Sequence, residues 1–435
     1  MTRPRVVICS PALTAVSGVS THANLLLHSP LASEFELLHF QVGSEGRREG
    51  RVRKAIRLAG SPFALANFLR RHRPAILHLN SSMDHKAYWR DALYRRVAHL
   101  LGIKVVMQIH GGPMPAAFLP SRRLASVLRR SLEASDAIAV LSSEEQAAYA
   151  AFCPTARVLC IPNAIDPAGL LGAIVESDRL RPLRLVYIGR LLREKGLFEV
   201  LGAIARLQAA GRRVVCDIAG SGPALAELEA TALRLGVRAA VTFHGPLFGA
   251  AKAALWRQAD LLAFPTYHPE GLPYSLLEAM AAGTPAITCA VAAIPDVMEH
   301  GVHGLFVPPR DAHALAAAIA ACDHDRTMLY RMALAGRARI EQAYTVARLS
   351  RDFSRLYHQL LGSAHAISGE ILAETYVQTH AEIHAKKIHT ETHVKTHVKI
   401  QSETHVENDV ETHAEADRPQ FAGVKAKAAA RRRPD

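Results

Sequence analysis

The sequence predicts an α/β protein built from two doubly wound domains. Short apolar runs, typical of buried strands, alternate with longer stretches of helical periodicity from Arg5 to Leu361. This alternation is interrupted once, between Pro162 and Asp178, and then resumes. The length of 435 residues suits two domains of ordinary size plus an additional segment. Each series of strands is therefore expected to form its own parallel sheet, covered by helices on both faces.

Several apolar runs precede the interruption and a similar series follows it. The first series is Arg5–Cys9, Leu37–Phe40, Ile76–Asn80, Lys104–Ile109, Ala137–Leu141 and Arg157–Ile161. The second series is Arg184–Ile188, Val214–Ala219, Val241–His244, Leu261–Phe264, Ala286–Cys289 and Gly304–Val307. Helical patterns lie between them, such as Leu197–Ala210, ended by Gly211, and Leu225–Leu235, ended by Gly236. Ligands of such sheets bind at the carboxyl ends of the strands, so a site is expected at the cleft between the domains.

Four segments are expected along the chain. They are an N-terminal domain over 1–170, a second domain over 171–343, a helix over 344–362 that crosses back to the first domain, and a tail over 363–435. The crossing helix places Tyr344, Ala347, Leu349, Phe353, Leu356, Tyr357 and Leu360 on one face. The tail repeats Glu-Thr-His and has few large apolar residues, so disorder is expected there. Some of its histidines recur at four-residue spacing, but Thr and Val disfavour the helix that a metal site would need.

The positive charge is concentrated in the first domain. The whole chain carries a formal charge of +13, and residues 1–170 hold 21 Lys and Arg against 11 Asp and Glu, a net +10. Basic clusters attract anionic membranes, nucleic acids or acidic small molecules. No recognition motif or aromatic platform accompanies the charge, so nucleic acid is not an expected partner. Apolar residues among the arginines from Arg51 to Phe68 favour a peripheral surface for anionic lipid.

Other features point to a cytoplasmic protein, peripheral on the inner face of a membrane. No stretch approaches 18 unbroken apolar residues, so we expect no spanning helix. Polar and helix-breaking residues interrupt Met1–Leu27, and no small-residue cleavage site follows, so a secretion signal is not expected. The six cysteines are scattered without a CxxC pair and are expected to be reduced, buried thiols.

The most informative segment runs from Phe264 to Pro285. A buried strand ends there, a loop with Gly and Pro follows, and a helix is expected to begin near Pro273. The helix N-terminus offers free backbone N–H groups to an anion. Glu270 and Glu278 would be roughly 12 Å apart over eight residues of ideal helix. They are too distant for a hydrogen-bonded carboxylate pair, but they can hold two ends of one elongated ligand.

This Glu-x7-Glu segment, ending in Leu-Glu-Ala-Met-Ala-Ala-Gly-Thr-Pro, resembles the signature of retaining glycosyltransferases of the GT4 family, which have the two-domain GT-B fold. The resemblance extends over about residues 5–360. Other matching segments follow in the family's order: Ser17–His22, Ile109–Gly112, Ile161–Asp166 and Val186–Gly196. Two positions depart from the pattern, since Ser17 and Ala164 stand where glycine is frequent. The resemblance implies two Rossmann-like domains that face each other across a cleft, joined by the crossing helix.

The resemblance also implies roles for individual residues. Arg190 and Lys195 would neutralise the leaving diphosphate without a metal ion. Glu278 would accept the ribose hydroxyls, and Glu270 and His110 would contact the donor sugar near the reaction centre. Gly18 would lie in a loop before a helix starting near Thr21, and its backbone would approach the donor phosphates. Further backbone contacts to sugar and phosphate would come from Gly189, Gly220, Gly271, Leu272 and Pro273.

The function that we expect is therefore retaining, metal-independent transfer of a sugar from a nucleotide sugar, with no cofactor. The acceptor would be a glycan or a lipid-linked precursor, and an anionic membrane surface is a further expected partner. Two alternatives stay open, a catalytically inactive sugar-nucleotide-binding scaffold and a GT-B nucleotide-sugar epimerase. An epimerase would need an additional acid/base set on the first domain. The intact set Arg190, Lys195, Glu270 and Glu278 disfavours an inactive scaffold.

Three other motifs are rejected. Gly220-Ser-Gly222-Pro has Leu225 where a dinucleotide fingerprint needs its third glycine, so NAD is not expected. Asp323-His-Asp325 has the spacing used by metal-dependent sugar transferases of another fold, but it follows a helix over Ala312–Cys322, away from any strand end. No phosphate-binding loop of the Gly-x4-Gly-Lys-Ser/Thr type occurs.

Overall fold

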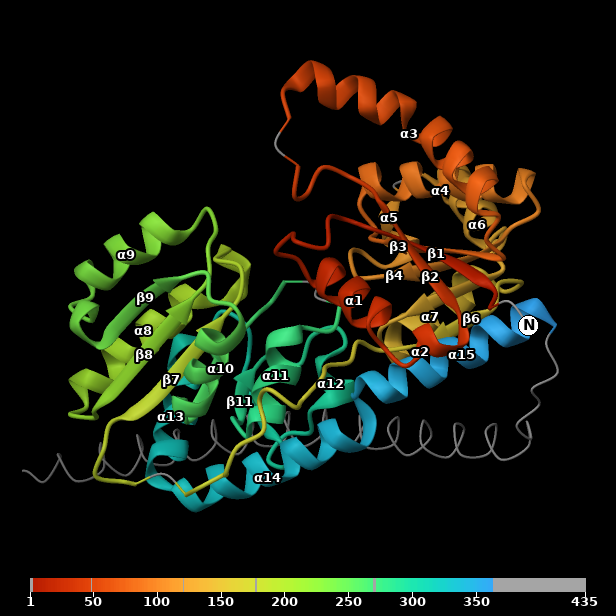
Figure 1. Ribbon diagram of the computed structural model, residues 1–435. Coiled ribbons are helices and arrows are strands. Elements are labelled where there is room, and N and C mark those ends of the chain that lie inside the picture. Colours follow the sequence, from red (N-terminus) through yellow and green to blue (C-terminus); the bar gives the residue numbers. More distant parts are fainter. Residues whose placement is uncertain (1–2, 48, 120, 177, 269–270, 363–435) are drawn as a thin grey trace, which may run out of the picture. The chain divides into compact units, whose positions relative to one another are not determined.

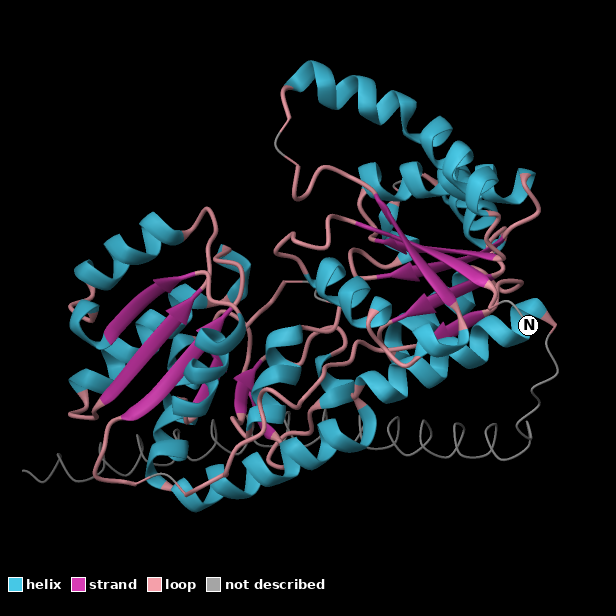
Figure 2. Cartoon of the chain, in the orientation of Figure 1, coloured by secondary structure: helices cyan, strands magenta, loops and turns pink. Residues whose placement is uncertain are grey.

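The computed structural model contains two parallel sheets of six strands each, with helices around both (Figures 1 and 2). It describes residues 3–47, 49–119, 121–176, 178–268 and 271–362. The tail over 363–435, with its expected disorder and histidine repeats, lies outside the described residues. Both sheets belong to one unit of the chain, Met1–Gly369, and the domain limits at 170 and 343 stay predictions.

The first sheet has the strand order β2-β1-β3-β4-β5-β6. Its strands are β1 (Arg5–Ser10), β2 (Glu36–Gln41), β3 (Ile76–Ser81), β4 (Lys104–Ile109), β5 (Ala137–Val140) and β6 (Val158–Cys160). The helices of this part are α1 (Gly18–Leu27), α2 (Leu31–Glu34), α3 (Arg51–His72), α4 (His85–Leu100), α5 (Pro115–Phe118), α6 (Arg122–Glu133) and α7 (Ser143–Phe152).

The second sheet has the order β12-β11-β10-β7-β8-β9. Its strands are β7 (Leu183–Ile188), β8 (Val214–Ala219), β9 (Val241–Gly245), β10 (Leu261–Phe264), β11 (Ala286–Thr288) and β12 (Gly304–Phe306). The α-helices around it are α8 (Leu197–Ala209), α9 (Leu225–Arg234), α10 (Gly249–Gln258), α11 (Tyr274–Ala282), α12 (Ile294–Val297), α13 (Ala312–His324) and α14 (Arg326–Ala343). Two short 3₁₀ turns, η1 (Arg193–Lys195) and η2 (Arg238–Ala240), complete this part.

The predicted fold class is confirmed, because each apolar run forms a strand of a parallel sheet. Such strands read as continuous apolar runs, since both of their faces are covered. In each sheet the chain starts in the interior, at β1 or β7, builds toward one edge and then returns to the other side. The loops that follow β1 and β7 therefore lie beside the point where the strand order reverses, the usual ligand position in such sheets.

Alternate residues of β1 serve two different cores. Val6 and Ile8 pack with side chains of α1, α2 and the last helix, while Val7 and Cys9 pack with side chains of α3 and α4. All four are at most 1% exposed. This alternation of side-chain direction along a strand gives the first sheet a buried apolar layer on each face.

The last described helix, α15 (Val346–Leu361), packs on the first sheet although it follows the second one in sequence. Leu349, Phe353, Leu356 and Tyr357 are buried in the core that contains Val6 and Ile8. The helix begins later than predicted, because the Thr345 hydroxyl accepts the N–H of Arg348 and caps it. The prediction is wrong for Tyr344, which ends α14 and packs in the core of the second sheet.

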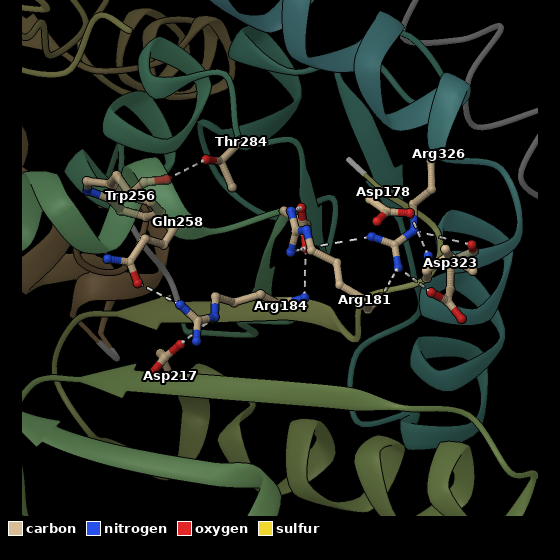
Figure 3. A network of polar contacts seen from close by, with 11 residues as sticks. Asp178, Arg181, Arg184, Asp217, Trp256, Gln258, Thr284, Asp323 and Arg326 are labelled. Carbon is tan, nitrogen blue, oxygen red and sulfur yellow. Dashed lines mark hydrogen bonds and ion pairs between the residues drawn. The ribbon is translucent and has the colours of Figure 1, made fainter. Parts of the chain in front are cut away.

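Charged side chains tie the amino ends of β7 and β10 to α14 (Figure 3). The Asp260 carboxylate accepts two hydrogen bonds from the Arg181 guanidinium, at 2.8 and 2.5 Å, and one from the Arg184 backbone N–H at 2.8 Å. Arg326, whose side chain is fully buried, lies 3.6 Å from Asp260 and donates to Asp323 at 2.6 Å. Asp323, part of the rejected Asp-x-Asp motif, thus serves this structural network.

Replacing Arg326 should test the network. Arg326→Met keeps most of the side-chain volume but leaves two carboxylates without a buried cation, so we expect the free energy of unfolding to fall by about 3–5 kcal/mol. Arg331→Met, on an exposed position of the same helix, is the matched control and should change it by less than about 0.5 kcal/mol. Urea unfolding followed by circular dichroism measures both. Equal midpoints for the two variants would show that the network does not stabilise the fold.

Candidate active site

The loops after β7 and β8 meet backbone to backbone at the carboxyl end of the second sheet. The Gly189 N–H donates to Ala219 O at 3.0 Å, and the Gly220 N–H donates to Gly245 O at 2.8 Å. A Cβ on Gly220, whose φ is +151°, would lie 1.8 Å from the Gly189 carbonyl oxygen. The chain therefore requires glycine at this position, since any side chain would separate the two loops.

Arg190 and Lys195 lie in the loop after β7 but in different surroundings. The Tyr187 hydroxyl donates to Arg190 O at 2.8 Å, while the Arg190 side chain is exposed. Lys195 ends η1, is 8% exposed, and places its Nζ 5.5 Å from the centre of the Phe264 ring. Burial, with the nearby Arg190 charge, lowers the pKa of Lys195 to about 7, against a smaller opposite effect of Glu194. The positive charge of Lys195 is thus easily lost near neutral pH.

The Lys195 loop is fixed to the segment that leads to Glu270. Glu194 O accepts the N–H groups of Tyr267, at 2.9 Å, and His268, at 3.2 Å. A Cβ on the neighbouring Gly196 would lie 2.2 Å from Pro265 O, so these two backbones also touch. Glu270 itself lies outside the described residues, and its predicted role stays a prediction.

Residues 271–273 are described, and they lie against the carboxyl end of β4. A Cβ on Gly271 would be 2.9 Å from His110 O and 2.7 Å from a Leu141 methyl group. Leu272 O accepts a hydrogen bond from the Asn163 side-chain amide at 2.8 Å. Pro273 directly precedes α11, close to the predicted helix start. The loop that carries Glu270 thus borders His110.

His110 is held as a neutral imidazole. Its Nε2 lies 2.8 Å from Asn80 Oδ1, and the Asn80 amide nitrogen donates to Cys9 O at 3.1 Å, which fixes the orientation of the amide. His110 Nε2 therefore carries the hydrogen, and Nδ1 is left as an acceptor. Burial, with a smaller contribution from His78, lowers the pKa of His110 to about 3. The imidazole can accept a hydrogen bond from a hydroxyl at Nδ1, but it supplies no positive charge near neutral pH.

Gly18 is the first residue of α1, so the prediction that this helix starts near Thr21 is wrong. The helix starts earlier because the Ser17 hydroxyl accepts the N–H of Ser20 at 3.2 Å and caps it. A Cβ on Gly18 would lie 3.6 Å from the Tyr274 ring, an ordinary contact. Packing within the chain does not require glycine here, and the proximity of Gly18 to a diphosphate stays a prediction.

Glu278 is bound at both of its oxygens by α10. Oε1 lies 2.6 Å from Lys252 Nζ, and Oε2 lies 3.3 Å from the indole nitrogen of Trp256. The carboxylate is 13% exposed and borders a cavity of about 540 Å³ that Thr21, Asp166 and Arg257 also line. The sequence motifs did not point to Lys252 and Trp256. Their spacing of four residues, which places both on one face of a helix, was the signal that could have identified them.

Apart from Glu278, which lies further along α11, the described residues of the predicted site form two groups. Gly18, His110, Gly271, Leu272 and Pro273 lie where α1, β4 and the start of α11 meet. The second group follows β7 and β8 and comprises Gly189, Arg190, Lys195 and Gly220. Among the described residues, no cluster of three or more His, Cys, Asp or Glu side chains could hold a metal ion. The expected independence of metal ions and cofactors stays a prediction.

Comparisons with known proteins match this architecture in two separate segments. Residues 29–168 match the model of the family described as Glycosyltransferase Family 4. Residues 176–339 match the model described as Glycosyl transferases group 1. The first segment contains the first sheet and its helices without β1 and α1, and the second contains the whole second sheet with α8 to α13 and most of α14.

Individual proteins are similar over parts of the chain. Glycogen synthase from Mycobacterium tuberculosis is 32% identical over 203 residues, 46% of this chain and 48% of that protein. The chain therefore spans about half the length of this relative. The 2-deoxystreptamine glucosyltransferase from Streptomyces kanamyceticus is 27% identical over 316 residues, 68% of this chain and 80% of that protein.

A solved structure shares the fold over most of the chain. HepE from Anabaena, in complex with UDP-glucose, superposes with a TM-score of 0.65 at 18% identity, covering 82% of this chain and 99% of that one. The superposition supports the two-sheet GT-B architecture, and the two family matches cover all the predicted motifs except Ser17–His22. On these grounds the chain belongs to the GT4 family of glycosyltransferases.

Proposed function

We propose that the protein is a retaining glycosyltransferase that transfers a sugar from a nucleoside diphosphate sugar to a hydroxyl-bearing acceptor. One observation supports this most directly. The Lys195 loop is hydrogen-bonded to the segment before Glu270, and the segment after Glu270 packs on His110. This arrangement supports a single donor site in which Lys195 would face the diphosphate and His110 the sugar, with the predicted sugar-binding residue Glu270 between them in sequence.

In the proposed reaction the bond between the anomeric carbon and the phosphate oxygen breaks while the acceptor oxygen bonds to the same carbon. The acceptor enters on the face that the diphosphate leaves, which retains the configuration, and the acceptor proton passes to the departing phosphate. Arg190 and Lys195 stabilise the negative charge that develops on this leaving group. The neutral His110 accepts a hydrogen bond from a donor-sugar hydroxyl at Nδ1, and Glu278 accepts the ribose hydroxyls.

The two alternative functions receive less support. An epimerase would need a group that gives and takes protons near the sugar, and the pKa of His110, lowered to about 3, does not suit that task near neutral pH. An inactive scaffold would not need Lys195 and His110 to lie on the two backbone segments that flank Glu270, one before it and one after it.

The first test is donor turnover, in which water serves as the acceptor. Incubating the protein with UDP-, GDP- and ADP-sugars should release sugar from one of them, and proton NMR at early times should show the anomer of the donor. Excess EDTA should leave the rate within about twofold, because side-chain cations take the place of a divalent ion. Lys195→Met should lower the rate by about 10²–10³-fold. Release of the opposite anomer, or loss of turnover with EDTA that Mg²⁺ restores, would contradict the proposal.

Lys195 also predicts a pH dependence of nucleotide binding. With a pKa of about 7 it is mostly neutral at pH 8 in the free protein, and a bound diphosphate should raise that pKa. Binding at pH 8 should therefore take up about one proton, and affinity should fall as the pH rises above 7. Titration calorimetry in phosphate and Tris buffers, using whichever of UDP, GDP and ADP binds best, measures this uptake.

The matched control for this measurement is Lys195→Arg. Its guanidinium is always charged, so binding should take up almost no proton. The nucleotide phosphates are themselves ionised at pH 8, since their last pKa is near 6, and add little. Equal proton uptake by parent and Lys195→Arg would assign the proton to another group.

The acceptor that we propose is lipid-linked or otherwise close to an anionic membrane. Residues 51–64 of α3 include no buried residue, and this segment exposes Val52 at 73%, Ile56 at 69% and Phe63 at 78% among basic side chains. Figure 1 shows α3 on the same side of the first sheet as α4, and α4 exposes Trp89 and Leu93. Exposed apolar side chains among basic ones are typical of surfaces that lie on anionic lipid. No helix in the described part of the chain is long and apolar enough to span a bilayer.

Vesicle sedimentation should test this surface. The parent should bind phosphatidylglycerol vesicles at low salt and bind them less as salt screens the charges. Substituting Val52, Ile56 and Phe63 together with Ser should weaken binding at least about tenfold, because the apolar area entering the lipid interface is lost. Leu233→Ser removes a similarly exposed side chain, at 66%, from α9 and should have no effect. Absence of binding at low salt would remove the membrane proposal.

A further inference from the structure

His22, on α1, contacts both sides of the candidate active site. It is completely buried, and its Nδ1 lies 3.3 Å from the hydroxyl oxygen of Tyr274, the first residue of α11. Its ring lies edge to face with the His110 ring, at 4.8 Å between centres. One turn earlier on α1, the Gly18 backbone packs on the Tyr274 ring. One imidazole therefore borders both the proposed sugar-binding histidine and the helix that carries Glu278.

The contact with Tyr274 suits the tautomer of His22 that carries its hydrogen on Nε2. Burial, with smaller contributions from His110 and His78, lowers the pKa of His22 well below its usual value, so the ring is neutral. When the Tyr274 hydroxyl donates to Nδ1, the hydrogen of the ring is on Nε2. That nitrogen is buried and lacks a hydrogen bond of good geometry, and so does the side-chain oxygen of Asn163. The Gln108 and Asn163 side chains both favour the charged form of His22, as nearby acceptors would.

Asn163 connects this pair back to the same loop. Its amide nitrogen donates to Leu272 O at 2.8 Å, and Asn163 is 4% exposed. His22 and Asn163 thus contact two residues, Leu272 and Tyr274, that are separated only by Pro273. Gly271, the residue before Leu272, packs on the His110 carbonyl. A displacement of Leu272–Tyr274 would therefore change the position of the Glu270 loop relative to His110.

We propose that His22 and Asn163 form a polar clamp on Leu272–Tyr274, and that His22 is a positioning residue for the transfer reaction. The clamp holds the donor-sugar loop against His110, while the diphosphate and ribose contacts come from other residues. This inference rests on the proposed function. Losing the clamp should lower turnover more than nucleotide affinity, because a displacement of about 1 Å at a reacting centre can reduce the rate about 10²-fold.

The structure offers matched variants for the test. Tyr274→Phe removes only the hydroxyl and keeps the ring against Gly18. The control is Tyr357→Phe, since the Tyr357 hydroxyl is also buried and lies 2.6 Å from Nδ1 of a buried histidine, His78, but its helix packs on the first sheet. His22→Leu removes the imidazole and with it the hydrogen bond to Tyr274. His22→Asn places an acceptor near the position of Nδ1 and should restore the bond from Tyr274.

The expected result is a separation of kcat from nucleotide affinity. Tyr274→Phe and His22→Leu should lower kcat for donor turnover about 10–100-fold, while the Kd for UDP, or for GDP or ADP if that binds better, stays within about threefold. His22→Asn should recover most of kcat, and Tyr357→Phe should stay within about twofold of the parent. In the double variant His22→Leu, Tyr274→Phe, the losses should not add, because both changes break the same bond.

Three outcomes would overturn the clamp. They are unchanged kcat in Tyr274→Phe and His22→Leu, additive losses in the double variant, or an equal loss in Tyr357→Phe. Thermal unfolding of each variant should be recorded, and if His22→Leu melts below the assay temperature, the comparison of Tyr274→Phe with Tyr357→Phe decides. If the parent turns over none of the nucleotide sugars, the proposed function fails instead. In that case, additive unfolding free energies of the same variants would still disprove the His22–Tyr274 coupling.

Discussion

The candidate active site depends on backbone contacts between loops that follow different strands. Gly220 touches the Gly189 carbonyl, Gly196 touches Pro265, and Gly271 touches His110, each at a distance that excludes a Cβ. Parallel sheets bring strand ends together at one edge, but ordinary side chains would hold the following loops apart. Glycine at these three positions lets the loops form one continuous surface. The charged and polar side chains of the site are placed by that surface.

Because the loops pack so closely, the polar groups between them lose water. Burial lowers the pKa of Lys195 to about 7 and that of His110 to about 3, and it keeps His22 neutral. Near neutral pH, Lys195, His110 and His22 therefore carry less positive charge together than three exposed side chains of these types would carry. A bound diphosphate would restore the Lys195 charge, so the full attraction between the ammonium group and the diphosphate would form only once the diphosphate is bound. No acidic side chain in the described part of the chain contributes to the pKa of His110 or His22, and both rings are neutral hydrogen-bonding groups.

The fold was predictable from the sequence because buried parallel strands are continuous apolar runs, as at Ile76–Ser81. Errors arose at helix ends, where a single hydroxyl decides the boundary, as Ser17 does for α1 and Thr345 for α15. The motif residues of the site were predictable because they are local in sequence. Their partners were not, since Asn163 and Leu272 are 109 residues apart and His22 and Tyr274 are 252 apart. Nothing local marks such pairs, and they follow only from the way the sheets and loops pack.

The contacts of Glu278 show how recognition of a nucleotide would depend on the protein's own interactions. Lys252 and Trp256 bind its two oxygens from one helix, so the carboxylate is already satisfied without a ligand. A ribose that bonds to Glu278 must replace or share the contacts with Lys252 and Trp256. Only the difference in free energy between the contacts that are lost and those that are gained contributes to nucleotide affinity. A preformed, satisfied carboxylate has the advantage of a fixed position and avoids an unpaired buried charge. In the proposed reaction Glu278 would contribute more to placing the nucleotide, while Arg190 and Lys195, whose interactions would strengthen as charge develops, would contribute more to the rate.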